Sequence, residues 1–464
     1  MSAGPFAKRK LHFVGIGGAG MSGLALVARA LGADVTGSDL AESSYTARLR
    51  ENGIEPSIGH DAKNVPSGAE VVVSTAIPAD NPELVAAEGP VIHRGELLGE
   101  VSRLKRAIAV AGTHGKTTTC GMAAHALSET GRDPAYLIGG ELRSAGNNAA
   151  WGEGEWIVVE ADESDRSFLQ LSRDVAVITN VELDHHHTYR SLSELNDAFG
   201  EFAAPAGVAI TGPGVEIEGT VEYGIEEGAL RADDLELRPL GSRFVVDGAE
   251  VELNVPGRHN VLNALAALGA CREAGLPIAE AAPALAGFTG AGRRFEDRGT
   301  TASGARVFDD YAHHPTEVRA TLEAARTLGA RRLLACFQPY LYSRTGMLAR
   351  AFGEALALAD LVAVLDVYPA RERAEDFPGV SGLTIARATA DAAGGRRVLW
   401  TPTVEHAAAR LAAEVGKGDA VLTLGAGDVD RVADLLTSRL RAGGASEQGF
   451  GRLRAGGACE QGFS

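Results

Sequence analysis

The sequence "AGTHGKTTT", residues 111–119, follows the apolar run "RAIAVA" and is the strongest local indication of the fold. A turn that joins a buried strand to a helix and ends in Gly-Lys-Thr is typical of loops that hold a nucleotide triphosphate. The full pattern begins with a glycine separated from the Gly-Lys pair by four residues, and this chain has Val110 there. A threonine cluster that caps an ordinary helix is therefore the alternative interpretation.

The residue types in this stretch suit a phosphate site. The backbone amides of residues 112–115 and the Lys116 ammonium would neutralise the β- and γ-phosphates, and the Thr117 hydroxyl would ligate Mg²⁺. This combination favours nucleotide binding over a simple helix cap. The predicted ATP-binding residues of the loop are Gly112, Thr113, His114, Gly115, Lys116, Thr117 and Thr118.

Length and charge restrict the remaining possibilities. A chain of 464 residues is too long for one core, so two to four domains are expected. The formal net charge of -17 argues against nucleic acid as a partner. Four scattered cysteines without a CxxC pair or a signal peptide predict a cytoplasmic location. No apolar run is long enough to span a bilayer, so membrane insertion is not expected.

Short apolar strands alternate with helical stretches along most of the chain, which predicts an α/β fold with parallel sheets. Binding sites of such sheets lie at the carboxyl ends of the strands. The segments "RLRAGGASEQGF" and "RLRAGGACEQGF" at the C-terminus are near-identical, and their Gly-rich composition predicts a disordered tail. We place the domain boundaries at residues 1–105, 106–291 and 292–442, followed by the tail at 443–464.

A second glycine-rich turn, "GIGGAGMSG", follows the first strand and opens a helix at residues 15–23. Asp39 ends the next strand, at the place where a dinucleotide fold has a ribose-binding carboxylate. The glycines could simply tighten a turn, but together with Asp39 they favour a nucleotide. Because no hydride-transfer site is evident downstream, a nucleotide sugar fits better than NAD.

Acidic and imidazole side chains follow two later strands. In "VVEADESD" (158–165), Glu160 stands at the strand end and is the candidate Mg²⁺ ligand, although such carboxylates also cap helices. Three consecutive histidines, residues 185–187, cannot all face one ion, which excludes a three-histidine zinc site. We expect one functional histidine, oriented by Asp184 or Glu182.

The helix opening "GRHNVLNALAA" (257–267) carries Asn260 and Asn263 one turn apart. Their amides suit an adenine edge, although Asn260 could be only a cap. The loops "GRRFE" (292–296) and "DDYAHHPTE" (309–317) are rich in charge, and a solvated surface loop explains each of them equally well.

Taken in order, "GIGGAGM", "GTHGKTTT", "GGELRSAGNNA", "VVEADESD", "HNVLNALAA", "RRFE", "DYAHHPTE" and "FQP…YSRT" resemble the Mur ligase family. The resemblance covers about residues 10–438, and the order of the motifs is far more specific than any one of them. The family's phosphate loop has the form "GTHGKTT" and does not require glycine at the position of Val110.

The resemblance implies three domains: a Rossmann-like UDP-substrate domain, a central P-loop ATPase domain and a C-terminal Rossmann-like domain. The resemblance is strongest to members that use ATP and Mg²⁺ to join L-alanine to UDP-N-acetylmuramate. It implies a monomer or homodimer that acts in cytoplasmic peptidoglycan precursor synthesis. In that reaction a carboxylate attacks the γ-phosphate, and the alanine amine then displaces phosphate from the acyl phosphate. Cations are needed because two anions must meet.

The resemblance also assigns roles to individual residues. Lys116, His185 and Arg294 would be catalytic, and Thr117, Glu160 and His185 would bind metal. His313 would line the cleft between the central and C-terminal domains. Further ATP contacts would come from Asn260, Asn263, Arg294, Asp310 and His314; UDP-substrate contacts from Gly15, Gly17, Gly18, Ala19, Gly20, Ser38, Asp39 and Ser74; and amino-acid contacts from Arg344 and Tyr340.

Two departures from the family's pattern stand out. Many members have aspartate at the position of His187, and many have His-Arg where this chain has Tyr340 and Leu341. Two rival functions share most of these motifs: a ligase that attaches a recycled tripeptide to the same UDP-sugar, and a nucleotide-sensing protein without catalysis. Intact Lys116, Glu160 and His185 argue against the second rival.

Overall fold

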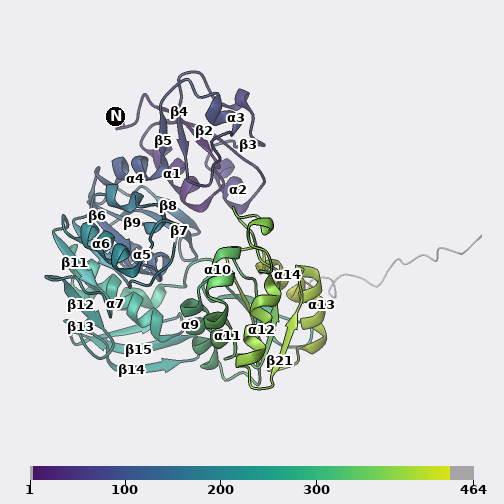
Figure 1. Ribbon diagram of the computed structural model, residues 1–464. Coiled ribbons are helices and arrows are strands. Elements are labelled where there is room, and N and C mark those ends of the chain that lie inside the picture. The colour runs from purple at the N-terminus through teal and green to yellow at the C-terminus, as the bar shows by residue number, and fades with distance from the viewer. Residues whose placement is uncertain (1–3, 186, 439–464) are drawn as a thin grey trace, which may run out of the picture.

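The computed structural model describes residues 4–185 and 187–438, and within them the chain forms three α/β units (Figure 1). Each unit is built on its own mainly parallel sheet, which confirms the predicted fold class. The predicted tail at 443–464 lies outside the described residues. The domain boundaries given above stay predictions.

The N-terminal unit is a five-stranded parallel sheet in the order β3-β2-β1-β4-β5. Strand β1 is buried along four of its five residues, so it forms the centre of this sheet. The elements are β1 (Lys10–Val14), α1 (Ala19–Ala30), β2 (Asp34–Asp39), α2 (Ser44–Glu51), β3 (Ser57–Ile58), β4 (Glu70–Val73), α3 (Pro82–Val85), β5 (Val91–His93) and α4 (Arg94–Ser102).

The central unit has an eight-stranded sheet in the order β13-β12-β11-β10-β6-β9-β7-β8, in which only the β7–β8 pair is antiparallel among the described strands. Its strands are β6 (Arg106–Ala111), β7 (Ala135–Leu142), β8 (Asn147–Ala150), β9 (Trp156–Glu160), β10 (Val175–Ile178), β11 (Val208–Thr211), β12 (Val221–Gly224) and β13 (Leu230–Arg231). Its helices are α5 (Lys116–Glu129), α6 (Leu192–Ala203), α7 (Arg258–Glu273) and α8 (Ile278–Ala284).

A polar stretch of the central unit forms a small antiparallel sheet of β14 (Asp233–Arg238), β15 (Gly241–Val246) and β16 (Ala249–Leu253). This sheet packs with α5, α7 and one face of the central sheet in a single apolar core. The helix predicted from the apolar spacing after residue 257 is α7, which is confirmed.

The C-terminal unit is a six-stranded sheet in the order β17-β18-β22-β19-β20-β21, with β17 antiparallel to its neighbour. Separate apolar cores fill its two faces, as expected for a doubly wound sheet. The elements are β17 (Glu296–Thr300), β18 (Arg306–Asp310), α9 (Pro315–Arg326), β19 (Leu333–Phe337), α10 (Tyr342–Met347), α11 (Ala349–Leu356), β20 (Leu361–Val364), α12 (Gly382–Ala392), β21 (Arg397–Trp400), α13 (Val404–Glu414), β22 (Ala420–Leu424) and α14 (Asp430–Thr437).

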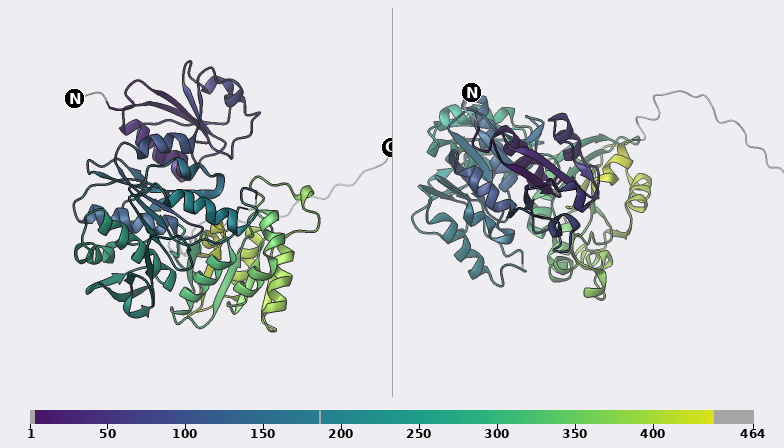
Figure 2. Two further views of the ribbon diagram at one scale, coloured as in Figure 1. Left: turned by 60° about the vertical axis from the view of Figure 1, so that its left-hand side comes forward. Right: turned by 90° about the horizontal axis from the view of Figure 1, so that it is seen from above.

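The N-terminal unit packs on the central unit through α1. The Asn148 side chain in β8 donates a 2.6 Å hydrogen bond to the Ala19 carbonyl, and a Cβ at Gly23 would lie 3.1 Å from Ala149. One apolar core therefore continues from α1 into the second face of the central sheet. Figure 2 shows the N-terminal unit at one end of the molecule and the C-terminal unit beside the central one.

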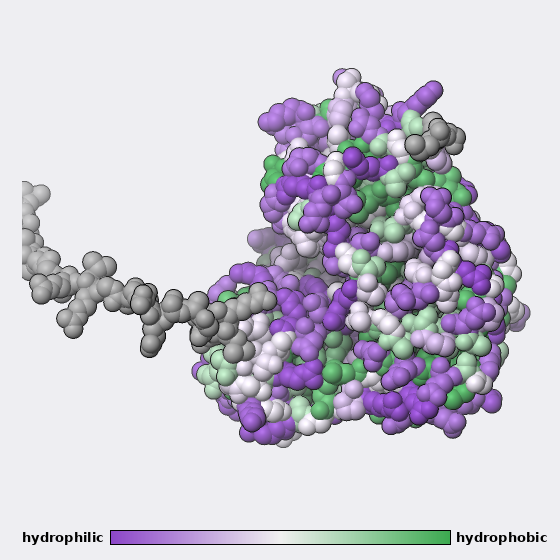
Figure 3. Space-filling view, turned by 180° about the vertical axis from the view of Figure 1, so that it is seen from behind, coloured by the Kyte–Doolittle hydropathy of each residue, from purple (hydrophilic) through white to green (hydrophobic). Residues whose placement is uncertain are grey.

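Hydrophilic residues cover most of the face seen from behind, and its outline is indented between the N-terminal and C-terminal units (Figure 3). Among the described residues, no helix is both long and apolar enough to cross a membrane.

Candidate active site between the three units

The phosphate loop connects the buried strand β6 to helix α5, and its backbone requires glycine at two positions. Gly112 has φ +125° and Gly115 has φ +84°, both in the range that favours glycine. A Cβ at Gly112 would lie 2.1 Å from the Thr179 hydroxyl, and one at Gly115 would lie 2.4 Å from Asn263 Oδ1. The loop therefore has no space for side chains at these residues.

The loop is held by the segment after β10. Asn180 accepts hydrogen bonds from the Thr113 amide through its carbonyl at 3.0 Å and from the His114 amide through Oδ1 at 2.9 Å. The expectation that all amides of residues 112–115 face phosphate is thus corrected, because two of them bind Asn180. The amides of the first turn of α5 remain for a ligand, since the N-cap residue Gly115 has no side chain to cap them.

Lys116 lies at the start of α5 and pairs with a carboxylate. Its Nζ donates to the Gly112 carbonyl at 2.6 Å and lies 2.8 Å from Glu163 Oε2. The Glu163 side chain is 1% exposed, so this is a buried ion pair. Burial lowers the pKa of Lys116, but neighbouring carboxylates, Glu163 foremost, outweigh it and leave the pKa raised. The lysine is therefore charged and ready to pair with a phosphate instead.

The oxygen ligands expected for Mg²⁺ lie beside the Lys116–Glu163 ion pair. The Thr117 hydroxyl donates to Glu160 Oε1 at 3.1 Å, and the Gly139 amide donates to Glu160 Oε2 at 2.7 Å. A hydroxyl and a carboxylate are hard oxygen ligands of the kind that Mg²⁺ prefers. These residues thus fit a magnesium nucleotide at the carboxyl ends of β6 and β9.

His185 is the histidine that faces the loop. Its Nε2 lies 3.3 Å from Glu163 Oε1 and 4.0 Å from Asp184 Oδ2, and its backbone has φ +54°, which is rare outside glycine. The carboxylate that orients the ring is therefore Glu163, and the expectation of Asp184 or Glu182 was wrong. His187 instead accepts a 3.3 Å hydrogen bond from Arg371 of the C-terminal unit.

Arg344 of α10 joins the C-terminal unit to the same segment. Its Nη2 donates to both Asp184 oxygens at 2.8 Å, and the guanidinium keeps the pKa of Asp184 far below its usual range although burial opposes this. The Nε and Nη1 atoms of Arg344 are buried without a hydrogen-bond partner among the described residues. Two donors of a buried guanidinium are thus available to a ligand.

Aromatic rings surround this arginine. The Tyr340 ring lies 5.9 Å from the guanidinium carbon of Arg344, 5.9 Å from the His313 ring and 6.0 Å from the Tyr368 ring. Leu341, next to Tyr340, is held at φ +67° and is the N-cap residue of α10. The departure at Tyr340 and Leu341 therefore lies directly at the arginine expected to bind the amino acid, whereas His187 contacts Arg371.

A second cluster lies where helix α9 meets the phosphate loop. His114 Nε2 lies 3.1 Å from Glu182, and its Nδ1 lies 3.5 Å from Glu317. Burial lowers the pKa of His114, but these two carboxylates outweigh it and raise the pKa to about 9. His314 is the N-cap residue of α9, and Arg294 lies 3.5 Å from Glu317. These contacts place loop 292–296 and the start of α9 beside the phosphate loop.

Three predicted ATP contacts already have partners within the protein. Asp310 is buried, which raises its pKa to about 6, and its oxygens accept the Phe295 and Ala312 amides, both at 2.8 Å. The Asn260 amide donates to the Pro256 carbonyl at 2.7 Å, and Asn263 donates to Asn260 at 3.1 Å. The two asparagines thus form a buried pair.

The glycine turn of the N-terminal unit has the geometry of an anion site. The Gly17 amide donates to Asp39 Oδ2 at 2.8 Å, and Gly15 has φ +78°. Gly18 is the N-cap residue of α1 and has no side chain to cap the amides of residues 19–20. These amides are therefore free of side-chain caps at a helix N-terminus.

Two other residues predicted to contact the UDP substrate, Ser38 and Ser74, differ in their surroundings. Ser38 is fully buried, and its hydroxyl donates to Glu83, so the expectation that it contacts a ligand is corrected. Ser38 therefore supports the end of β2 from within the core. Ser74 lies in the turn after β4, where its hydroxyl accepts the Ala76 amide at 3.4 Å.

All three units meet near Glu160. Tyr45 of α2 is largely buried, which raises its pKa, and the nearby charges of Glu141 and Glu160 add to the effect. Arg48, also in α2, lies 2.6 Å from Glu141 in the central unit. Sequence reasoning did not select Tyr45, and no local pattern marks it.

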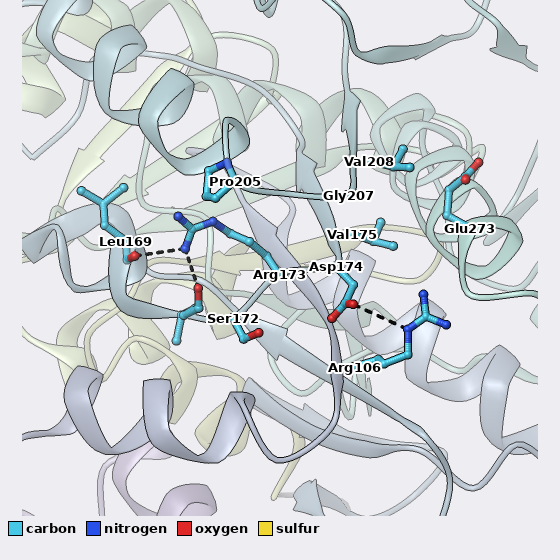
Figure 4. A pocket seen from close by; sticks show the side chains of 11 residues that line it. Arg106, Leu169, Ser172, Arg173, Asp174, Val175, Pro205, Gly207, Val208 and Glu273 are labelled. Carbon is cyan, nitrogen blue, oxygen red and sulfur yellow. Dashed lines mark hydrogen bonds and ion pairs between the residues drawn. The ribbon is translucent and has the colours of Figure 1, made fainter.

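A hollow of about 620 Å³ lies elsewhere, at the amino ends of β6, β10 and β11 (Figure 4). Its two arginines already have partners: Arg106 lies 3.6 Å from Asp174, and Arg173 donates to the Phe202 carbonyl at 2.7 Å. The phosphate loop follows the opposite end of β6, so this hollow is no part of the candidate site.

Sequence reasoning missed Glu163 and Glu317 as site residues, although both stand in motifs that it quoted. Their common signal is a carboxylate within a few residues of a predicted ligand. It expected Glu182 to orient a histidine among residues 185–187, whereas Glu182 pairs with His114. Fold and site together define an α/β protein with a phosphate loop that a third unit contacts through α9, while Arg344 of that unit pairs with Asp184 after β10.

Comparison with known proteins agrees with this class. Residues 10–106 match the Mur ligase family catalytic domain, residues 110–271 the Mur ligase middle domain, and residues 293–427 the Mur ligase glutamate ligase domain. The chain belongs to the Mur ligase family, which confirms the resemblance inferred from its motifs.

Individual relatives are similar over nearly the whole chain. The UDP-N-acetylmuramate–L-alanine ligase of Rubrobacter xylanophilus is 46% identical over 452 residues, covering 93% of this chain and 100% of the relative. The enzyme of the same description from Streptomyces coelicolor is 47% identical over 451 residues, covering 92% and 96%.

Two solved structures share the fold. A UDP-N-acetylmuramate–alanine ligase from Thermotoga maritima has a TM-score of 0.81 and 31% identity, covering 94% of this chain and 99% of its own. A murein peptide ligase from Psychrobacter arcticus has a TM-score of 0.70 and 25% identity, covering 94% and 98%.

Proposed function

We propose that this chain joins L-alanine to UDP-N-acetylmuramate, with ATP converted to ADP and phosphate. The observation that carries the proposal is the full-length similarity to ligases described by that reaction. The buried Lys116–Glu163 pair and the Thr117–Glu160 contact agree with it, because they supply the cation and the oxygen ligands that the phosphates need.

Each residue around the phosphate loop has a proposed task. Lys116 exchanges Glu163 for the β- and γ-phosphates, and Arg294 adds a second positive charge. Mg²⁺, when bound by Thr117, Glu160 and His185, neutralises phosphate charge so that a carboxylate can approach. Asn260, Asn263, Asp310 and His314 remain proposed nucleotide contacts.

The UDP-sugar is assigned to the glycine turn at residues 15–20, with Asp39 and Ser74. Helix α1 offers uncapped amides there, which suits a pyrophosphate. The N-terminal unit and the phosphate loop converge around Tyr45 and Glu160, so a sugar bound to one can present its carboxylate to the other.

Arg344 is assigned to the alanine carboxylate. Its Nε and Nη1 are buried N–H donors without a protein partner in the described chain, so each can donate a hydrogen bond to an anion. Tyr340 and His313 pack around it and restrict the volume, which favours a small acceptor. The amine of the alanine bound in this pocket then attacks the acyl phosphate, and phosphate leaves.

We further propose that the reaction serves peptidoglycan precursor synthesis in the cytoplasm, and so contributes to cell shape and division. The enzyme would act as a monomer or homodimer.

Transfer of a radiolabelled acceptor to UDP-N-acetylmuramate tests the function directly. Incorporation of labelled L-alanine, with ADP formed in equal amount, is expected, and the labelled tripeptide should not be incorporated. Tripeptide incorporation alone would identify a murein peptide ligase. Incorporation of neither, with ATP still bound, would identify a nucleotide-sensing protein.

A further inference from the structure

Three side chains from separate segments converge beside the phosphate loop. His114 follows β6, Glu182 follows β10, and His314 begins α9 of the C-terminal unit. One ligand atom from each lies within 4.8 Å of the other two, and within the described ranges this is the group of three that meets that criterion. The cluster therefore spans two units and does not depend on any single loop.

The distances suit a tetrahedral ion. His114 Nε2 lies 3.1 Å from Glu182 Oε2, and His314 Nδ1 lies 3.8 Å from the same oxygen. Ligands about 2.0–2.1 Å from a tetrahedral Zn²⁺ are about 3.3 Å apart, so the two observed values bracket the required separation. The ligand atoms of the third pair, His114 and His314, lie within 4.8 Å of each other, so these two side chains must move closer to bind one ion.

The surroundings orient these ligands. Glu317 lies 3.5 Å from Nδ1 of His114, the nitrogen opposite the one that faces Glu182. A carboxylate on the far side of a metal-binding imidazole fixes the ring and its tautomer. Thr316 donates a 2.8 Å hydrogen bond to the other oxygen of Glu182, which orients that carboxylate.

The donor set distinguishes this cluster from the magnesium candidate. Two imidazoles and one carboxylate suit Zn²⁺ and related transition metals, whereas Mg²⁺ prefers oxygen ligands. His314 is 3% exposed and His114 is largely buried, so the two imidazoles are shielded from bulk water, whereas the Glu182 side chain is 41% exposed.

We propose that His114, Glu182 and His314 form a transition-metal site that takes Zn²⁺ and clamps the C-terminal unit onto the phosphate loop. The ion would replace the weak 3.4 Å contact from the Thr316 amide to His314 Nδ1 with a metal bond. Binding of the ion is independent of the proposed ligase function, so the two can fail separately.

Titration of the metal-free, full-length protein with Co²⁺ tests the site. Tetrahedral Co²⁺ gives visible absorption, and mildly alkaline pH reduces proton competition for the imidazoles. We expect one equivalent to bind with a tetrahedral spectrum, and one equivalent of Zn²⁺ to displace it. Absence of a tetrahedral spectrum would overturn the proposal.

Matched variants separate this site from the magnesium candidate. Glu182→Gln and His314→Gln should each weaken Co²⁺ binding at least tenfold, whereas His185→Gln and the exposed His406→Gln should keep it. Unchanged binding in both cluster variants, or loss of binding in His185→Gln, would show that the ion sits elsewhere. Two cluster variants are used because His314 also caps α9 and its replacement can weaken the fold.

Thermal unfolding gives a second readout. One equivalent of Zn²⁺ should raise the melting temperature of the parent and of His406→Gln, because the ion binds only when both units are in place. It should not raise the melting temperature of Glu182→Gln. An equal rise in Glu182→Gln would contradict a clamp at this cluster.

Discussion

Nη2 of Arg344 donates to both carboxylate oxygens of Asp184 at 2.8 Å, while Nε and Nη1 of the same guanidinium are buried without a partner within residues 4–185 and 187–438. One arginine thus joins the C-terminal unit to the segment that carries His185 and still has two unpartnered donors. The ion pair holds the guanidinium in place before any anion arrives, which reduces the entropy lost on binding.

Arg344→Lys should raise the KM for L-alanine by roughly tenfold or more, because one lost charge-assisted hydrogen bond is worth about 1.5–3 kcal/mol. A lysine can keep the charge opposite Asp184 but lacks the additional N–H donors that the guanidinium offers to an anion. Steady-state kinetics with each substrate varied in turn gives the three KM values.

The KM values for ATP and UDP-N-acetylmuramate should change little. Arg350→Lys is the matched control, since that side chain is 93% exposed and pairs only with Glu354 among the described residues. A change confined to the KM for ATP would assign Arg344 to the nucleotide and not to the acceptor.

Lys116→Met should lower kcat by a factor of about 100 or more, because it removes charge neutralisation at the phosphates. It also leaves Glu163 buried without its cation, so stability falls as well. Lys116→Met/Glu163→Gln should recover stability without recovering activity. Rates of ADP release and urea unfolding curves separate these effects.

Lys63→Met is the control for loss of a lysine, since Lys63 is 80% exposed and pairs with Asp61. Activity of Lys116→Met within a few-fold of the parent would remove Lys116 from the mechanism.

Gly115→Ala should weaken ATP binding and destabilise the protein. Its φ of +84° is strained for alanine by about 1–2 kcal/mol, and the new Cβ would lie 2.4 Å from Asn263 Oδ1. Gly200→Ala in helix α6 meets open space, and we expect it to stabilise the protein by about 0.5–1 kcal/mol. Calorimetric ATP titration and thermal unfolding check both variants; normal ATP affinity in Gly115→Ala would contradict the loop geometry.

Glu83 should contribute to acid sensitivity. Burial raises its pKa, but hydrogen bonds from His12, Ser38 and Asn64 outweigh burial and hold the pKa at about 2, below the ordinary 4.5. Because the folded-state pKa is the lower one, the stabilisation is present above pH 4.5 and is lost as the pH falls towards 2. The difference corresponds to about 3 kcal/mol.

Glu83→Gln should therefore be less stable than the parent at neutral pH and lose less stability on acidification. The comparison needs urea unfolding at several pH values, because His12 and His60 both face Glu83. The exposed Glu88→Gln is the control. Parallel pH profiles for the parent and Glu83→Gln would contradict the assigned pKa.

Deletion of residues 443–464 should leave the melting temperature and turnover nearly unchanged. The repeated Gly-rich sequence has too little apolar content to offset the entropy of ordering. Differential scanning calorimetry and steady-state rates of the shortened chain provide the check, and a large loss in either would indicate that the repeat docks on the enzyme.

The residues of the phosphate loop and the strand-end carboxylate could be predicted from the sequence, because each depends only on its neighbours along the chain. Gly112 and Gly115 are needed for positive φ, Lys116 and Thr117 follow at the helix start, and Glu160 ends a strand. Each feature depends on neighbours a few residues away, so the motif alone indicates it.

The sequence by itself thus determined the α/β class, the phosphate loop and the family. The pairing of the side chains followed from the tertiary structure alone. Glu163 pairs with Lys116 and His185, Asp184 pairs with Arg344, and Glu182 pairs with His114. Contacts between residues 20 to 160 positions apart depend on how the sheets pack and how the units dock. No local periodicity encodes that packing, because it results from burial of apolar surface over whole units.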